Sequence, residues 1–300
     1  MEWQGEATAI ARRRHGEHAV ILTALTRDLG LISGVVPGGA SVRRAAMLQP
    51  GNRLSLRWRA RLDDQLGSFT VEPGRTRAGL MADADELAGL NAVTALIAWA
   101  LPERDPHPRL VDATEDLLDA MEGGSGGGAG GTAGAGGLSA PLAATAAFLA
   151  ENGPPDRFPG DRKPRRYSGE EETRGPPWTE QYLRWELLLL DELGFGLSLD
   201  RCAVSGAREG LAYVSPKTGH AVTAEAAGEW AARLLPLPGI LGGVGQGGGL
   251  AAGFALTGHF LNARLAEAQV GRPLPAARAR LVARLTAAAP KEKDRPEERP

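Results

Sequence analysis

The clearest pattern in the chain is a strict alternation of apolar and polar positions between Asn52 and Leu62. A period of two is typical of a half-buried β-strand. Runs rich in β-forming residues, separated by glycine and proline turns, also cover residues 7–13, 18–26, 31–36 and 67–72. Five short strands within residues 1–80 predict a small closed barrel, and the OB-fold is the leading candidate.

Helical spacing of apolar residues replaces this alternation after residue 81. The pattern predicts helices over 83–101, 108–121, 179–193, 224–235, 251–266 and 275–289. Residues 197–223 are irregular, with a possible hairpin at 212–214. We therefore predict an α+β multidomain chain, with an OB-fold barrel over 1–80 and an all-α helical domain over 81–290.

Two segments are low in complexity or strongly polar. Ten of the fifteen residues 123–137 are glycine, and residues 151–177 are polar and rich in proline. Such composition is typical of flexible linkers and disorder. We predict that 123–177 is a flexible insertion within the helical domain, and that the charged segment 291–300 is a disordered tail.

Charge is distributed unevenly, although the formal net charge is only −2. Residues 1–80 contain 12 Arg, no Lys and 7 acidic residues, whereas residues 81–122 contain 2 Arg and 10 acidic residues. Residues 123–300 are balanced, with 20 basic and 19 acidic residues. This asymmetry indicates a basic binding module joined to a differently charged body.

Candidate catalytic and metal motifs fail on their context. Gly123–Gly127 matches G-x-S-x-G, but it lies in a glycine tract and not between a strand and a helix. Cys202 is the single cysteine, so neither an internal disulfide nor a four-thiolate zinc site is possible. We expect no enzymatic activity, no cofactor and no bound metal. The chain shows no signal peptide and no spanning apolar run, which indicates a cytoplasmic protein without membrane association.

The arginines of the first domain are the main candidate binding residues. Alternate residues of the 53–61 strand lie ~6.6 Å apart, which suits phosphates along a single strand. The alternative is an ordinary solvated outer face, and Trp58 falls on the apolar face as a core residue. Arginine without lysine and with few acidic neighbours favours phosphate binding. The proposed DNA-binding residues, with Arg43 and Arg44 placed in a loop, are Arg12, Arg13, Arg14, Arg43, Arg44, Arg57, Arg59 and Arg61.

Two segments of the chain resemble a known family. The first is the run from Tyr182 to Gly206 containing YLRWEL, LGFGL and RCAV, followed by AYVSPK at 212–217. The second is the N-terminal order RRHGE, a strand, residues 34–40, and LQPG before the arginine strand. Both resemble the RecO family of DNA repair proteins, over nearly all the chain except 123–177, 242–249 and the tail.

The resemblance implies a recombination mediator of the RecF pathway type. Such a protein binds single- and double-stranded DNA, anneals complementary strands and helps to load RecA, without nucleotide hydrolysis. It engages RecR and the acidic C-terminal tail of single-stranded DNA-binding protein, in the nucleoid region of the cytoplasm. Arginines that could line the groove for that tail are Arg184, Arg264, Arg278, Arg280 and Arg284; on the alternative interpretation, the last three form a solvated helix face.

The chain departs from the family pattern at one place. Many members carry a four-cysteine zinc site, whereas here Cys202 matches the first ligand and Ser205 stands at the second. Thr223 and Ala226 fall near the second pair. We expect a metal-free loop, with Cys202 as a small buried residue.

A second hypothesis treats the chain as a protein-interaction adaptor. In it the barrel is structural and the helical body docks partners. The acidic first helices would repel DNA, so they could face a basic partner.

Overall fold

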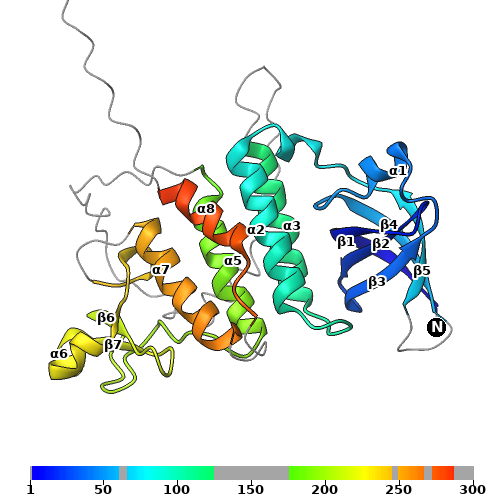
Figure 1. The fold of residues 1–300 in the computed structure, drawn as a ribbon. Helices are drawn as coiled ribbons and strands as arrows, with labels where there is room; N and C mark the ends of the chain where they lie inside the picture. The colour runs from blue at the N-terminus through cyan, green and yellow to red at the C-terminus, as the bar shows by residue number, and fades with distance from the viewer. Residues whose placement is uncertain (1, 61–65, 125–175, 245–248, 267–271, 287–300) are drawn as a thin grey trace, which may run out of the picture.

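The computed structural model describes residues 2–60, 66–124, 176–244, 249–266 and 272–286. A barrel lies at one end of the molecule, helices form the middle, and a small sheet lies at the other end (Figure 1). The expected insertion at 123–177 and the tail at 291–300 fall almost wholly outside the described residues.

Five strands close the N-terminal barrel in the order β1-β2-β3-β5-β4. The β3–β5 pair is parallel and the other pairs are antiparallel. This architecture confirms the prediction of an OB-fold barrel followed by a helical body. The strands are β1 (Glu2–His15), β2 (Ala19–Thr26), β3 (Gly30–Val36), β4 (Arg53–Arg59) and β5 (Gly67–Pro73).

The longest strand, β1, serves two neighbours. Its register is interrupted between Ala9 and Ala11; residues 2–8 pair with β4 and residues 7–15 with β2. A bulge of this kind bends a strand and allows a sheet to close. The two halves of β1 therefore lie in different surroundings, which matters for the arginines described below.

The alternation in β4 is confirmed. Leu54, Leu56 and Trp58 are buried in the barrel, and the arginines between them are exposed. Trp58 is 3% exposed and is a core residue, as expected. A Cβ at Gly67 would overlap the Trp58 indole, so the facing strand needs glycine there.

Helices pack beside the barrel and against one another. The N-cap Asp83 of α2 accepts hydrogen bonds from the backbone N–H groups of Asp85 and Glu86 at 2.7 and 3.1 Å, as expected for an aspartate at this position. The elements are α1 (Val42–Met47), η1 (Ala78–Met81), α2 (Ala84–Ala100), α3 (Pro108–Gly124), α5 (Thr179–Glu192), α7 (Leu250–Phe260), the π-helical η4 (Leu261–Ala266) and α8 (Ala276–Thr286).

The small sheet at the far end contains the expected hairpin. The strands β6 (Leu211–Val214), β7 (Ala221–Thr223) and β8 (Leu235–Pro236) lie in the order β7-β6-β8. The helix predicted over 224–235 is wrong in extent: it is α6 (Ala224–Ala227) followed by the 3-10 turn η2 (Gly228–Arg233). Gly228, with φ +47°, ends the α-helix. A further 3-10 turn, η3, covers Gly239–Leu241.

The segment with Arg43 and Arg44 is helical and is not the expected loop. The carbonyl of Ser41 accepts the N–H of Ala45 at 2.8 Å, which begins the single helical stretch α1. Six residues are too few for apolar periodicity to reveal a helix. Leu48, fully buried directly after α1, anchors this segment on the barrel.

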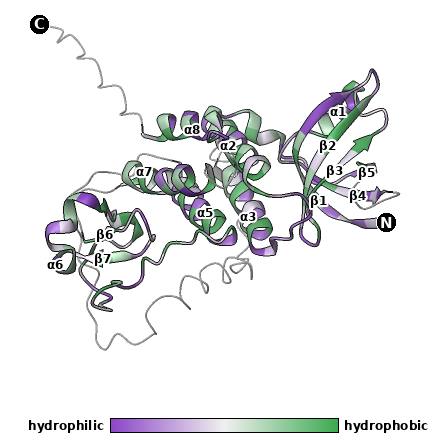
Figure 2. Ribbon diagram, turned by 60° about the horizontal axis from the view of Figure 1, so that its bottom comes forward, coloured by the Kyte–Doolittle hydropathy of each residue, from purple (hydrophilic) through white to green (hydrophobic). Residues whose placement is uncertain are grey.

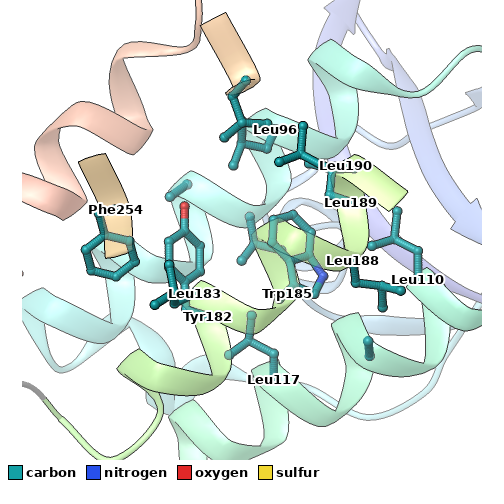
Figure 3. Packing of buried hydrophobic residues seen from close by; sticks show 14 of the residues in the cluster. Leu96, Leu110, Leu117, Tyr182, Leu183, Trp185, Leu188, Leu189, Leu190 and Phe254 are labelled. Atoms are coloured by element: carbon teal, nitrogen blue, oxygen red, sulfur yellow. The ribbon is translucent and has the colours of Figure 1, made fainter. Parts of the chain in front are cut away.

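Barrel and helices share an apolar core. Ile10, Leu25 and Leu31 of the barrel belong to the same buried cluster as the residues of α2, α3 and α5. Figure 3 shows the centre of the helical part, where Tyr182 stacks on Trp185 with ring centroids 6.0 Å apart. The barrel is thus packed on the body through apolar side chains as well as through charges.

One close approach fixes the barrel against the α2–α3 loop. Gly30 has φ +67°, and a Cβ there would overlap the carbonyl oxygen of Asp105. The carbonyl of the next residue, Leu31, accepts a hydrogen bond from the N–H of Arg104 at 2.9 Å. The Ser33 hydroxyl donates to Glu103 at 2.7 Å. The loop therefore adds to the edge of β3.

A buried ion pair holds α8 to the rest of the helical body. Glu186 on α5 is fully buried and accepts two hydrogen bonds from the Arg278 guanidinium, at 2.7 and 2.8 Å. Thr257 on α7 donates to the same carboxylate at 2.6 Å. Burial opposes the Arg278 charge, but Glu186 raises the pKa of Arg278 above its usual value.

Replacing Arg278 with methionine is expected to lower the free energy of unfolding by about 3–5 kcal/mol, because Glu186 would remain buried without its cation. Urea denaturation measures this loss. Arg280→Met, on the exposed face of the same helix, is the matched control and should change stability little. Equal unfolding midpoints for the two variants would contradict the structural role of the pair.

Candidate nucleic-acid interface

Five arginines gather at the end of the barrel that carries α1. The second half of β1 pairs with β2 and ends in a turn at Gly16, and the carbonyl of His18 in this turn accepts the N–H of Ala40 at 3.2 Å. This contact brings the β1–β2 turn beside α1. In Figure 2 a hydrophilic stretch of ribbon lies at this end beside the hydrophobic barrel strands. We call these residues the tip arginines: Arg12, Arg13, Arg14, Arg43 and Arg44.

The tip arginines keep their charges available. All five are exposed, and none pairs with a carboxylate within the described part of the chain. Arg44 donates a hydrogen bond to the carbonyl of Pro37. Glu17 is the one carboxylate in the β1–β2 turn, and its partner is His18, at 3.8 Å. An anionic polymer would therefore meet little competition here.

The arginines of β4 lie in different surroundings. Arg59 donates to Glu2 at 3.0 Å, Arg57 donates to Gln4 at 3.0 Å, and Arg53 pairs with Glu6. The expectation of few acidic neighbours was wrong, because β1 places its own polar residues opposite each β4 arginine. These side chains are about half exposed, so the pairs are weak and exchangeable. Arg61 lies outside the described residues.

Sequence reasoning missed the arginines that face the acidic helix α3. Arg77 is 1% exposed; its Nη2 lies 2.9 Å from Glu115 Oε2, its Nε 3.1 Å from Asp119 Oδ1 and its Nη1 2.8 Å from the Gly51 carbonyl. Asn52 Oδ1 accepts the Arg77 backbone N–H at 2.9 Å. Burial opposes the Arg77 charge, but the two carboxylates raise its pKa.

Three half-exposed arginines surround this buried contact. Arg75 donates to Asp119 and Glu122, each at 2.7 Å. Arg27 pairs with Asp112, and Arg53 Nη1 lies 3.9 Å from Glu115. One pattern in the sequence could have indicated this interface. The acidic residues of α3 recur at i, i+3 and i+4 on the face opposite its leucines, which marks an acidic helix face. The second hypothesis assigned this acidic face to a basic partner. In the structure, arginines of the same chain cover it.

Crowding affects one carboxyl group on α3. Burial raises the pKa of Asp116, and repulsion from Asp112, Asp119 and Glu115 raises it further. Asp116 pairs with no arginine within the described residues. The other acidic residues of this face are ion-paired, so Asp116 differs from its neighbours in this respect.

A pocket of about 200 Å³ lies between the segment after α5 and the end of α7. Arg264 is its charged residue, and Phe195, Leu197 and Phe260 supply apolar side chains. The remaining lining residues are Gly194, Gly196, Thr218 and Gly219.

The other arginines considered for an acidic tail are not at this pocket. Arg278 is buried in its pair with Glu186. It therefore neither belongs to a solvated helix face nor is available to an acidic tail. Arg184 pairs with Glu180, and Arg284 with Asp85, each at 2.7 Å. Arg280 is exposed on α8.

The loop with Cys202 does not fit a structural zinc ion. The Cys202 sulfur accepts the N–H groups of Ser205 and Thr223, each at 3.4 Å, and lies 3.8 Å from Thr223 Oγ1. That hydroxyl accepts the N–H of Ala226 at 3.2 Å. One thiol, two hydroxyls and a methyl group do not supply the four thiolate or imidazole ligands of such a site.

The described residues limit other kinds of site. They contain no group of three or more His, Cys, Asp and Glu side chains placed to hold a metal ion. None of their helices combines the length and the apolar character required to cross a bilayer.

A closed OB-fold barrel with an arginine-rich end, joined to a helical body, is an architecture typical of nucleic-acid-binding proteins. Two family models match the chain: Recombination protein O N terminal over residues 1–75 and Recombination protein O C terminal over residues 170–272. The first covers the barrel, and the second covers α5, the small sheet, α7 and η4.

Full-length relatives agree with both models. The DNA repair protein RecO of Paracoccus denitrificans is 58% identical over 287 residues, which cover 96% of this chain and 97% of that protein. The RecO proteins of Cereibacter sphaeroides (strain ATCC 17025) and Roseobacter denitrificans are 45% and 44% identical, each covering 94% of this chain and 97% of the relative. The chain belongs to the RecO family of DNA repair proteins, and its role is in DNA repair.

The only cysteine of the chain allows a direct test of the loop. Burial opposes ionisation of Cys202, but the Ser205 hydroxyl and the backbone N–H groups of Ser205, Thr223 and Val204 lower its pKa to about 6. The ultraviolet absorbance of the thiolate should therefore titrate near pH 6 in the folded protein and near the ordinary value of about 8.5 in denaturant. Because the folded pKa is the lower one, this group adds stability that is fully present above the unfolded value and is lost as pH falls through about 6.

Added zinc should leave this titration unchanged. Stoichiometric zinc in the purified protein, or a folded midpoint at the ordinary thiol value, would contradict the metal-free hydrogen-bonded loop.

Proposed function

We propose that the chain is a non-catalytic recombination mediator. Its barrel, residues 1–80, binds single- and double-stranded DNA and supports annealing of complementary strands. Its helical domain, residues 81–290, docks RecR and the C-terminal tail of single-stranded DNA-binding protein, and so helps to load RecA on coated DNA. It acts in the cytoplasm, at the nucleoid.

The tip arginines carry this proposal. Arginine binds phosphate through two parallel N–H donors and stacks on bases. The tip arginines are exposed and have no carboxylate partner within the described residues. Phosphates that bind there would replace water, counter-ions and, at Arg44, the hydrogen bond to the Pro37 carbonyl. The release of DNA counter-ions favours binding.

The β4 arginines form a second part of the surface. Arg57 and Arg59 must exchange contacts with Glu2 and Gln4 for contacts with phosphate. Each phosphate contact of a β4 arginine therefore contributes less binding free energy than a contact of a tip arginine. Arg61, which lies outside the described residues, stays a proposed contact.

The pocket beside α7 favours the docking of an acidic tail. Arg264 gives a cation for a carboxylate, and the half-buried Phe195 gives a small apolar contact. Among the five arginines considered for this role, Arg264 alone lines this pocket. We assign the tail of single-stranded DNA-binding protein to it.

The same pocket also supports the second hypothesis, a protein-interaction adaptor with a structural barrel. Titration of labelled single-stranded DNA at low and moderate salt separates the two. An adaptor would show no salt-dependent binding, whereas the mediator would.

Changing Arg12, Arg13 and Arg14 together to glutamine should weaken DNA binding and flatten its salt dependence. If each arginine contacts one phosphate, the log–log slope should fall by about 2, at about 0.7 per contact for single strands. Fluorescence anisotropy over a salt series measures both quantities.

Arg57→Gln with Arg59→Gln is the control pair, because these arginines already have polar partners. Its effect per residue should be smaller. Unchanged affinity and slope in the triple variant would show that DNA does not bind at the tip.

A further inference from the structure

Three barrel arginines pair with the acidic face of α3 while remaining half exposed. Arg27, Arg53 and Arg75 have side chains that are 56%, 44% and 49% exposed. We call them the rim arginines. They differ from Arg77, which is buried in the same interface.

The partners of the rim arginines form a row of anions. The carboxylates of Asp112, Glu115, Asp119 and Glu122 follow one another at intervals of three or four residues on α3. With a rise of 1.5 Å per residue, the row has a spacing of about 5 Å. Arg75 takes two of these carboxylates on its two terminal nitrogens, as an arginine fork takes two oxygens of a phosphate group.

The rim pairs are not needed to hold the barrel in place. Arg77 and the shared apolar core with Ile10, Leu25 and Leu31 already fix it on the body. Exposed ion pairs contribute little to stability and are screened by salt. The rim pairs have a second effect. While they are formed, an anion from outside cannot bind the rim arginines.

We propose that α3 acts as an internal polyanion that occupies the rim arginines and keeps DNA away from them, on the surface formed by the tip arginines and by Arg57 and Arg59 of β4. The inference rests on the proposed DNA binding and adds the contact that limits it. Removing a carboxylate of α3 that pairs with a rim arginine releases that arginine, which then becomes available to phosphate. DNA binding and the α3 contact compete for the same guanidinium groups.

The test compares Asp112→Asn with Asp116→Asn. Both variants remove one negative charge from α3, but Asp112 pairs with Arg27, whereas Asp116 pairs with no arginine within the described residues. Binding is measured by anisotropy over a salt series, with a labelled single-stranded oligonucleotide long enough to pass along the whole barrel. Circular dichroism confirms that both variants fold.

Asp112→Asn should bind the oligonucleotide several-fold more tightly than the wild-type chain, with a slope steeper by about 0.7 for one new phosphate contact. Asp116→Asn should keep the wild-type slope. Adding Glu122→Gln to Asp112→Asn should steepen the slope again, because it frees one arm of Arg75.

Two outcomes overturn the inference. Wild-type slopes in both variants would show that the rim arginines do not become available, and an equal gain in both would indicate general repulsion by α3. The wild-type titration separates these from failure of the proposed function, in which no salt-dependent DNA binding occurs at all.

Discussion

The buried Arg77 cation is the constraint on which the arrangement of this chain depends. A charge that is 1% exposed is stable only where anions surround it, and Glu115 and Asp119 supply them from α3. These contacts determine which face of the barrel meets the helical body. They also explain why a strongly acidic segment follows a basic one in the sequence. The two are partners within a single interface, which the apolar contacts of Ile10, Leu25 and Leu31 extend.

This interface divides the arginines of the barrel by availability. Near α3 they pair with carboxylates, and along β4 they pair with polar residues of β1. At the tip, beyond both sets of partners, they remain open to an anion. The bulge near Ile10 underlies this division, because it directs the first half of β1 toward β4 and the second half toward β2. Position in the fold, more than the number of arginines, therefore defines the proposed DNA surface of this RecO-family protein.

The sequence predicted what depends on local pattern. Alternation identified β4 with Leu54 and Trp58 inward, and apolar spacing identified the long helices. It failed where partners are distant in the chain. Nothing local marks Arg278 as the partner of Glu186, 92 positions away, or Arg77 as the partner of Glu115. The short helix α1 was missed because six residues show no period, and the pairing of Glu2 and Glu6 with β4 depends on strand register that only the closed barrel reveals.

Hydrogen–deuterium exchange of the full chain with saturating single-stranded DNA tests the central claim most directly. If charge pairing keeps DNA away from the rim arginines, bound DNA should slow exchange chiefly in the β1–β2 turn and in α1. Exchange along α3, which the arginines of the barrel cover, should stay as it is in the free protein. Slower exchange along α3 with no change at the tip would contradict the account.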